Sequence, residues 1–561
     1  MTLVVEPGVV EWLDIVLRDG RVRKSVPAGG RGIPLAAICR DMPAWTVADL
    51  SLRQKVGQLF VVGFDGPDVT PQLESLLTDW GIGGVLYFAR NLSTPSQTEA
   101  LSASLQRLAA EANLPPLLVA IDQEGGPVTR IPWGANPPSA MAIGATGREA
   151  LAAEAGAAIA DELRALGINL NFAPVLDVNV NPENPVIGIR SFGDNPALVG
   201  RFGSQFAEGI QRADVLTCVK HFPGHGDTVS DSHHELPVLP HNRERLDRVE
   251  LAPFRRAVDA GVDAVMTTHV SFPAVTGVAD RPATIAPSVV SGLLRDELGF
   301  EGLVVTDCLE MDAIASGIGT VEAAVQAIEA GCDLLTISHT PERQEAAMRA
   351  VLDAVRTGRL SEARLDESVE RVLAAKRAAA ADAGDSPGWE LAADRVADVA
   401  ARTASDSVTL VRDREGTLPL DGTVTVVTFD DADTSAGDGD SEVADLAAAV
   451  DSPDCSVIHR TADVTTDDAG TVVVGTTDAS ADDEQVRFVR ELAGSTVRLV
   501  VVALSSPYDL RLFPEVPCYL TTYGDSDAAM AALGRVLRGD TSPKGESPVS
   551  IGQDSPDSNF G

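Results

Sequence analysis

Lysine is scarce in this sequence of 561 residues, in which the lysines are Lys24, Lys55, Lys220, Lys376 and Lys544. The basic residues, nearly all arginines, number 44 against 82 acidic residues, and the formal net charge is -38 at pH 7. A protein with this charge is repelled by nucleic acid and by anionic membranes, which excludes both as partners. Because molar salt screens the repulsion between so many carboxylates, the composition predicts adaptation to high salt. The alternative is an ordinary acidic protein of the cytosol.

The sequence also lacks paired cysteines and long apolar runs. Its 6 cysteines are widely scattered and none forms a CxxC pair, so neither a zinc site nor a disulfide framework is predicted. No apolar run is long enough to cross a bilayer, and no signal peptide is recognisable. We therefore expect a protein that acts in the cytoplasm, on small or imported molecules.

Short apolar runs alternate with helical patterns over residues 49–380. The runs are KVGQLFVVGF, GGVLYFAR, PPLLVAID, INLNFAPVLDV, VLTCVKHF, AVMTTHV, GLVVTDCL and CDLLTISH. Continuous runs of Val, Leu and Ile that alternate with helices are typical of a parallel sheet covered on both faces. About eight such units in a row predict an α/β fold of the (β/α)8 TIM-barrel type.

Four further segments are predicted outside the barrel. Residues 1–48 carry no clear periodic pattern and form an N-terminal extension, while AGDSPG breaks the helical pattern and predicts a linker over residues 381–390. Residues 391–540 contain about five or six strand-like runs with helices between some of them, which suits a doubly wound αβα sandwich domain. Residues 541–561 are rich in Ser, Pro, Gly and Asp, and we expect a disordered tail there.

Polar side chains stand at the ends of the apolar runs in the barrel region. In a barrel the C-terminal ends of all strands meet at one face, where active sites lie. The alternative is that polar residues simply mark where strands stop. This alternative explains less easily why nearly every strand ends in a titratable residue. The residues concerned are Asp65, Arg90, Asp122, Asp177, Lys220 with His221, His269, Asp307 and His339.

The densest group of candidate functional residues is the segment KHFPGHGDTVSDSHH, residues 220–234. It holds four of the 8 histidines and the rare Lys220, and its Gly and Pro residues predict a loop. Asp231 and His233 are two residues apart, so in an extended loop the carboxylate can orient the imidazole and raise its basicity for acid–base catalysis. Metal binding and a purely structural loop are the alternatives, although no HExxH or CxxC spacing supports a metal.

Three other segments present candidate residues. Asp307 ends the seventh apolar run, where a barrel exposes it to the pocket, although an Asp at a strand end is often a helix N-cap. AIDQEGGPVTR places Asp122 at the end of the third run with Arg130 just beyond it. NPVIGIRSFG is a turn-rich loop that presents Arg190.

Together these segments resemble family 3 glycoside hydrolases, specifically the β-N-acetylglucosaminidase branch. KHFPGHG followed by DSH is specific for that branch, and DQEGG, NFAPVLDV, VIGIRSFG and VVTDCLEMDAI occur in the expected order. SVTLVRDREGTLPL, VVALSSPYDL and SPVSI resemble the family's C-terminal αβ sandwich, so the likeness covers nearly the whole chain. Pro127 departs from the pattern, because the family usually has an arginine after DQEGG. His234, directly after DSH, is a second departure.

The resemblance implies roles for single residues. Asp307 matches the family's nucleophile, and His233 matches its acid/base, paired with Asp231. The family's residues that bind the hydroxyls of the terminal sugar correspond to Asp122, Arg130, Arg190, Lys220 and His221.

The expected function is therefore that of a retaining exo-β-N-acetylhexosaminidase. It forms a covalent glycosyl intermediate on Asp307, acts on a small carbohydrate and needs no metal or other cofactor. Two alternatives are enzymes of the same family: a β-N-acetylglucosaminide phosphorylase using the same residues, and a β-glucosidase, against which KHFPGHG with DSH argues. The third alternative, an inactive glycan-binding protein, has no need of Asp307, His233 and Asp231.

The charge of -38 predicts that stability depends on salt. At roughly 0.01 M salt, repulsion between carboxylates is unscreened over about 30 Å. The melting temperature should therefore rise with KCl concentration, and activity should rise with it. The measurement is a series of melting curves between low and molar KCl, and a flat response would remove the argument.

Overall fold

The computed structural model describes residues 12–16, 22–27, 45–381, 387–429, 446–450, 455–459 and 470–551. Most of the expected extension, most of the linker and the tail beyond Ile551 lie outside these residues. Within the extension, β1 (Trp12–Val16) pairs antiparallel with β2 (Val22–Pro27). The domain limits expected from the sequence stay a prediction, and the elements below are given as the structure has them.

Eight parallel strands close into a barrel in the order β10-β3-β4-β5-β6-β7-β8-β9. Each of the eight apolar runs contains one of these strands, so the predicted TIM barrel is confirmed. The strands are β3 (Phe60–Gly63), β4 (Gly84–Tyr87), β5 (Leu118–Ile121), β6 (Leu170–Asn171), β7 (Leu216–Phe222), β8 (Ala264–Thr267), β9 (Leu303–Cys308) and β10 (Leu334–Ile337).

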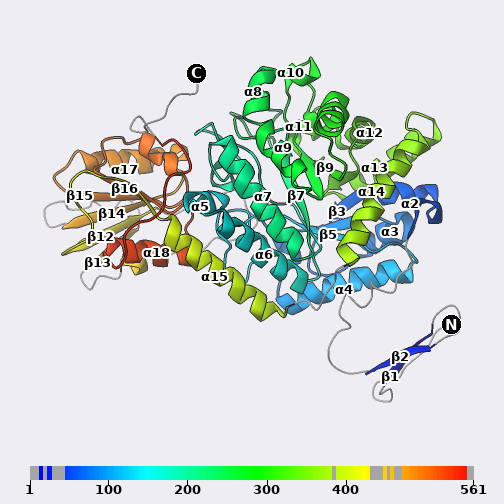
Figure 1. Cartoon of the computed structure of the whole chain (residues 1–561), viewed down its shortest axis with the longest axis horizontal. Helices are drawn as coiled ribbons and strands as arrows, with labels where there is room; N and C mark the ends of the chain where they lie inside the picture. Colours follow the sequence, from blue (N-terminus) through cyan, green and yellow to red (C-terminus); the bar gives the residue numbers. More distant parts are fainter. Residues whose placement is uncertain are drawn as a thin grey trace.

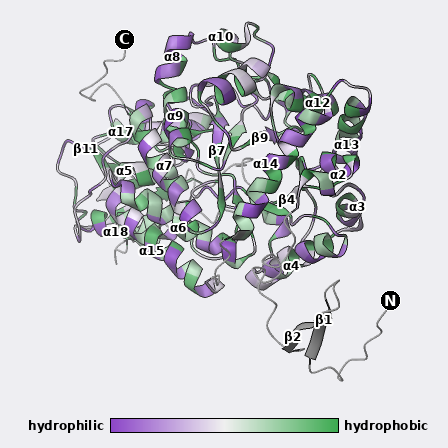
Figure 2. Ribbon diagram, turned by 45° about the vertical axis from the view of Figure 1, so that its right-hand side comes forward, coloured by the Kyte–Doolittle hydropathy of each residue, from purple (hydrophilic) through white to green (hydrophobic). Residues whose placement is uncertain are grey.

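Helices surround the barrel and connect its strands (Figure 1). They are α2 (Leu52–Gly57), α3 (Pro71–Trp80), α4 (Pro95–Glu111), α5 (Ala140–Ala145), α6 (Glu149–Ala165), α7 (Pro196–Arg212), α8 (Arg243–Arg248), α9 (Leu251–Asp259), α10 (Pro273–Thr276), the π-helical η5 (Ser288–Glu297), α11 (Asp312–Ala315), α12 (Thr320–Ala330), α13 (Pro341–Arg356) and α14 (Glu362–Ala381). Hydrophilic and hydrophobic residues alternate along outer helices such as α7 and α14, because one face of each packs on the barrel (Figure 2).

The sequence sets where several of these helices begin. Thr70, Thr94 and Asn195 are N-caps whose side chains accept a hydrogen bond from a backbone N–H in the first turn. In each case a proline follows at the first helical position, where its fixed φ suits the helix and its missing N–H costs nothing. These starts direct α3, α4 and α7 back along the outside of the barrel.

The second sheet has six strands in the order β11-β16-β15-β14-β12-β13, parallel except for β11. Separate hydrophobic clusters cover its two faces, which makes this part a doubly wound αβα sandwich. The strands are β11 (Thr409–Asp413), β12 (Val424–Thr428), β13 (Cys455–His459), β14 (Thr471–Thr476), β15 (Arg498–Ala503) and β16 (Cys518–Thr521), and the helices are α16 (Leu446–Val450), α17 (Asp483–Ala493) and α18 (Asp527–Leu537).

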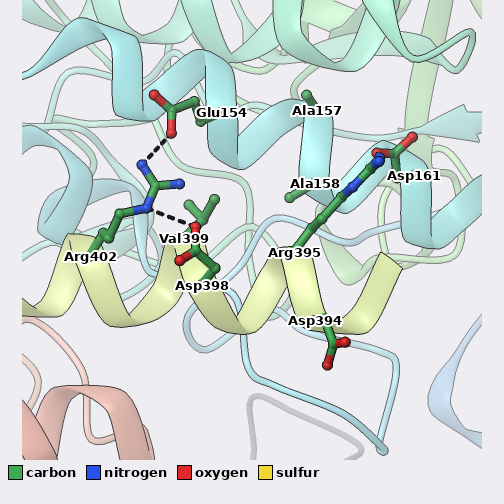
Figure 3. A pocket seen from close by; sticks show the side chains of 9 residues that line it. All are labelled: Glu154, Ala157, Ala158, Asp161, Asp394, Arg395, Asp398, Val399 and Arg402. Atoms are coloured by element: carbon green, nitrogen blue, oxygen red, sulfur yellow. Dashed lines mark hydrogen bonds and ion pairs between the residues drawn. The ribbon is translucent and has the colours of Figure 1, made fainter. Parts of the chain in front are cut away.

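The long helix α15 (Trp389–Ser407) joins the two parts by lying along α6 of the barrel (Figure 1). Small side chains, Ala157 and Ala158, face α15 across a shallow groove (Figure 3). Ion pairs between Arg395 and Asp161 and between Arg402 and Glu154 bridge this groove.

Part of the expected tail is also attached to the barrel, since the N–H of Glu546 donates to the carbonyl of Ala145. No helix in the described part of the chain has the length and apolar character needed to span a membrane.

Helix α14 covers the N-terminal mouth of the barrel. Val372 belongs to the same hydrophobic cluster as the inward-facing side chains Val61, Leu118 and Leu303 of the strands. Beside it Lys376 is buried, and its Nζ donates to Oε1 of Gln58 at 2.7 Å. Burial lowers the pKa of Lys376 to about 7.

Lys376→Met should change how stability depends on pH. Between about pH 7 and 10 the unfolded chain keeps a proton on Lys376 that the folded chain lacks, so wild-type stability rises with pH in this window. Methionine keeps the apolar stem but cannot titrate, so the variant should lose this part of the slope, on the order of 3 kcal/mol across the window. Urea unfolding at several pH values measures both proteins, and parallel curves would contradict the assignment.

Candidate active site

Lys220 is the centre of a buried ion network at the C-terminal end of the barrel. Its Nζ lies 2.6 Å from Oδ1 of Asp122 and 2.5 Å from Oε1 of Glu124, and only 3% of its side chain is exposed. Arg190, from the loop after β6, donates through Nε and Nη2 to both oxygens of Glu124 at 2.9 Å. The fold therefore gathers Asp122, Lys220 and Arg190 from three separate segments around one carboxylate.

The charges in this network hold one another in their ionised forms. Burial by itself raises the pKa of Glu124, but the positive charges of Arg190 and Lys220 bring that pKa well below its ordinary value. Burial likewise favours the neutral amine of Lys220, but Asp122 and Glu124 raise its pKa overall. The result is a fixed set of charged donors and acceptors, the kind of groups that recognise hydroxyls.

Arg130 lies in the loop after β5, on the same side of the barrel. Its guanidinium carbon is 5.8 Å from the ring centre of Phe88, and its backbone N–H donates to Oε1 of Gln123 at 2.8 Å. Its Nε is buried with no hydrogen-bond partner among the described residues, so it is a donor that a ligand can satisfy. Pro127 lies at the exposed tip of the same loop, in the turn that brings Val128 back to Gly125.

Asp307 stands near the C-terminal end of β9, and its carboxylate is kept ionised. Its Oδ1 accepts the N–H of Cys308 at 2.7 Å. Burial acts to raise the pKa of Asp307, but the neighbouring imidazoles of His269, His221 and His233 lower it below its ordinary value. An ionised carboxylate on a rigid strand, surrounded by histidines, can act as a nucleophile.

His233 and Asp231 form the pair expected from the sequence. Nδ1 of His233 lies 2.7 Å from Oδ1 of Asp231, and the N–H of His233 donates to the same oxygen at 2.8 Å. The side chain of His233 is 58% exposed, so its other nitrogen is accessible. The hydrogen bond to Asp231 raises the pKa of His233, and the charge of Asp307 adds to this effect.

A further carboxylate, Asp177, holds the start of the histidine-rich loop. It is fully buried, and its Oδ2 lies 2.6 Å from Nδ1 of His221. Its Oδ1 accepts the backbone N–H of His225 at 2.6 Å. Asp177 therefore connects His221 to the loop that continues to His233.

The histidines of this loop take different partners, which argues against the alternative of a metal site built from them. In the described part of the chain, Asp227, His241 and Glu250 form the one group of three ligand-type side chains close enough to share an ion. However, Nη2 of Arg245 lies 3.3 Å from Asp227 and 3.1 Å from Glu250 and already supplies a positive charge. This group is an ion-pair network.

Sequence reasoning missed four residues of this site. Glu124 stands two positions after Asp122 in DQEGG, and its position beside Lys220 required the tertiary structure. Asp177 and His269 were recognised as strand ends, and His225 as one of four clustered histidines, but none received a role. Of the other strand-end residues, Arg90 contacts Asp65 at 3.1 Å and donates to the carbonyl of Ser338 at 2.9 Å, so it joins neighbouring loops.

The closed barrel with this site defines a glycoside-cleaving enzyme, and comparison with known proteins agrees. The model of the glycosyl hydrolase family 3 N-terminal domain matches residues 51–375. This chain belongs to glycoside hydrolase family 3.

Curated relatives and a solved structure add detail. The chain is 38% identical over 328 residues to a protein of Pseudoalteromonas piscicida named beta-hexosaminidase A, an alignment that covers 54% of this chain and 55% of that protein. It is 31% identical over 557 residues to a beta-N-acetylglucosaminidase/beta-glucosidase of Cellulomonas fimi, covering 91% and 96% of the two chains. The structure of a family 3 beta-N-acetylglucosaminidase from Paenibacillus sp. is similar with a TM-score of 0.84 and 43% identity, over 90% of this chain and 99% of that one. The chain spans about half the length of the Pseudoalteromonas protein.

Glu124→Gln should damage both stability and activity. Glutamine leaves Arg190 without an ionic partner and Lys220 with Asp122 alone, and breaking a buried ion pair costs about 3–5 kcal/mol. We expect a fall of this size in the free energy of unfolding, measured with urea, and a loss of kcat/KM on an aryl glycoside.

Glu162→Gln is the matched control. Glu162 is as buried as Glu124, but neither of its oxygens has a partner among the described residues, and burial raises its pKa to about 8. Glutamine mimics its neutral form and needs no proton, so the substitution should not lower the unfolding free energy. Between about pH 4.5 and 8 it should raise it, because the wild-type chain must bind a proton on Glu162 to fold. Equal effects of the two substitutions would show that the network around Glu124 has no special role.

Proposed function

We propose that this chain is a retaining exo-β-N-acetylhexosaminidase that removes terminal β-linked N-acetylglucosamine. The observation that carries the proposal is the Asp231–His233 pair, placed within electrostatic range of the ionised Asp307. A carboxylate and a separate proton donor are the two groups that retaining hydrolysis requires. The names of relatives similar over half to nine-tenths of the chain support the same substrate class.

In the first step a carboxylate oxygen of Asp307 bonds to the anomeric carbon of the sugar. The bond to the leaving oxygen breaks, and protonated His233 gives that oxygen its proton. Oδ1 of Asp231 accepts a hydrogen bond from Nδ1 of His233, which leaves Nε2 of His233 to face the substrate. The raised pKa of His233 favours the protonated form that this step needs.

In the second step neutral His233 takes a proton from water as the water oxygen attacks the anomeric carbon. The bond to Asp307 breaks, the sugar leaves with retained configuration, and both residues return to their starting forms. A histidine base carries no negative charge, so it does not repel Asp307 or an approaching anion. The sugar hydroxyls are held by Asp122, Arg130, Arg190, Lys220 and His221.

Four measurements test the substrate class and the nucleophile. A panel of aryl glycosides should show the highest kcat/KM on the N-acetylglucosaminide, and preference for the glucoside would favour a β-glucosidase. Added phosphate should leave free sugar as the product, and sugar 1-phosphate would identify a phosphorylase. A fluorinated donor that traps the covalent intermediate should label Asp307, and Asp307→Ala should be inactive but folded.

His233→Ala should lose most activity where the leaving group needs a proton. A sugar leaving group needs protonation as its bond breaks, so kcat/KM on chitobiose-like substrates should fall by about 10²–10⁴-fold. A nitrophenolate leaves with little help, so kcat/KM on nitrophenyl substrates should fall much less. Asp231→Asn should give a milder version of the same pattern.

His234→Ala is the control in the same loop. His234 is exposed, and only its backbone N–H contacts Asp231, at the carbonyl oxygen. Its kinetics should match the wild type on both substrates. Equal losses on both substrates in His233→Ala would point to binding or folding, and His233 would lose its assigned role.

A further inference from the structure

Next to His233, the loop is held by contacts of Ser232. Ser232 is buried, although Val229 three positions earlier is 81% exposed. The Oγ of Ser232 lies 3.0 Å from Nε2 of His225, and the carbonyl of Ser232 accepts the N–H of Ala313 in α11 at 3.3 Å.

The neighbours of Ser232 make only local hydrogen bonds. In the structure as described, Asp231 and His233 bond to each other, and the carbonyl of Asp231 accepts from the N–H groups of His234 and Glu235. Among the described residues, neither has a hydrogen bond to a strand of the barrel. The Nδ2 of Asn181 holds the loop further back, at the carbonyl of Thr228 at 2.8 Å, and the contacts of Ser232 are the ones next to the pair itself.

His225 is itself rigidly held. Its imidazole is 1% exposed, and its backbone N–H donates to the fully buried Asp177 at 2.6 Å. Its Nδ1 lies 2.8 Å from Oγ1 of Thr228, and that hydroxyl donates its one proton to the carbonyl of His225 at 3.1 Å. In this arrangement Nδ1 carries the hydrogen, and Nε2 is the acceptor.

The remaining lone pair of His225 points to Ser232. Because Nε2 is an acceptor, the hydroxyl of Ser232 donates to it. Burial lowers the pKa of His225 to about 4, so this neutral arrangement persists at ordinary pH. A continuous chain of hydrogen bonds thus runs from Asp177 through His225 to Ser232.

We propose that His225 and Ser232 are positioning residues for the acid/base pair, and that their hydrogen bond holds His233 at the leaving oxygen. The inference rests on the role proposed above for His233. Neither residue touches the reacting atoms. They act by keeping Asp231 and His233 in the geometry in which the proton can be delivered. A small displacement of His233 from this geometry would reduce the rate.

Ser232→Ala tests the proposal with the smallest change. Alanine removes the donor and leaves the backbone contact to Ala313 in place. Loss of one hydrogen bond should lower kcat/KM on a chitobiose-like substrate about tenfold. On a nitrophenyl substrate, which hardly needs the proton, kcat/KM should fall less than about twofold and KM should stay constant.

Two substitutions of His225 form a matched pair. Asparagine can replace Nδ1 as the donor to Thr228 but is too short to reach Ser232, so His225→Asn should show the same dependence on leaving group as Ser232→Ala. Glutamine reaches the position of Nε2, and His225→Gln should recover most of the activity on the poor leaving group. The double variant Ser232→Ala with His225→Asn should lose no more than either single variant, because both remove one interaction.

Val229→Ala is the control for changes in the loop, because the exposed side chain of Val229 takes no part in the hydrogen bonds from Asp177 to Ser232. Melting curves of every variant separate loss of fold from loss of geometry. If Ser232→Ala and His225→Asn show no loss, or equal losses on both leaving groups, the positioning role is overturned while His233 keeps its own. If His233→Ala itself shows no dependence on leaving group, the acid/base assignment and this inference both fail.

Discussion

Pairing of β10 with β3 closes the barrel, and the site exists because of this closure. Leu335, Thr336 and Ile337 align with Phe60, Val61 and Val62, so the last strand meets the first in register. A closed parallel barrel brings the C-terminal ends of all its strands to one face. Asp122, Lys220 and Asp307, nearly two hundred residues apart at the extremes, meet there as a consequence.

Within that face, opposite charges are matched residue by residue. Lys220 and Arg190 balance Asp122 and Glu124, while Asp307 is surrounded by imidazoles. Buried ions are costly unless paired, so this balance keeps the site both folded and charged. The two groups proposed for catalysis differ in setting, because Asp307 lies on a strand whereas His233 lies on an exposed loop.

The sandwich domain contributes to the site indirectly, through the loop after β6. Ile189, next to Arg190, packs in the same hydrophobic cluster as Tyr508 of the sandwich and Val549 of the segment that follows it. The hydroxyl of Tyr508 donates to the carbonyl of Asn179 at 3.2 Å, two residues after Asp177. The loop that bears Arg190 is thus held from the barrel side and from the sandwich side.

The sequence by itself determined the local features of this protein. Period and length of the apolar runs predicted the barrel, because a buried parallel strand needs a continuous apolar segment. The pairing of Asp231 with His233 could also be predicted, because residues two positions apart in an extended loop have side chains on the same side. Glu124 beside Lys220, Asp177 beneath His221 and His225 against Ser232 were decided only by tertiary structure. These contacts join separate segments or orient a folded loop. The side chains meet only when the barrel closes or the loop folds, and no periodicity in the sequence encodes the distance between them.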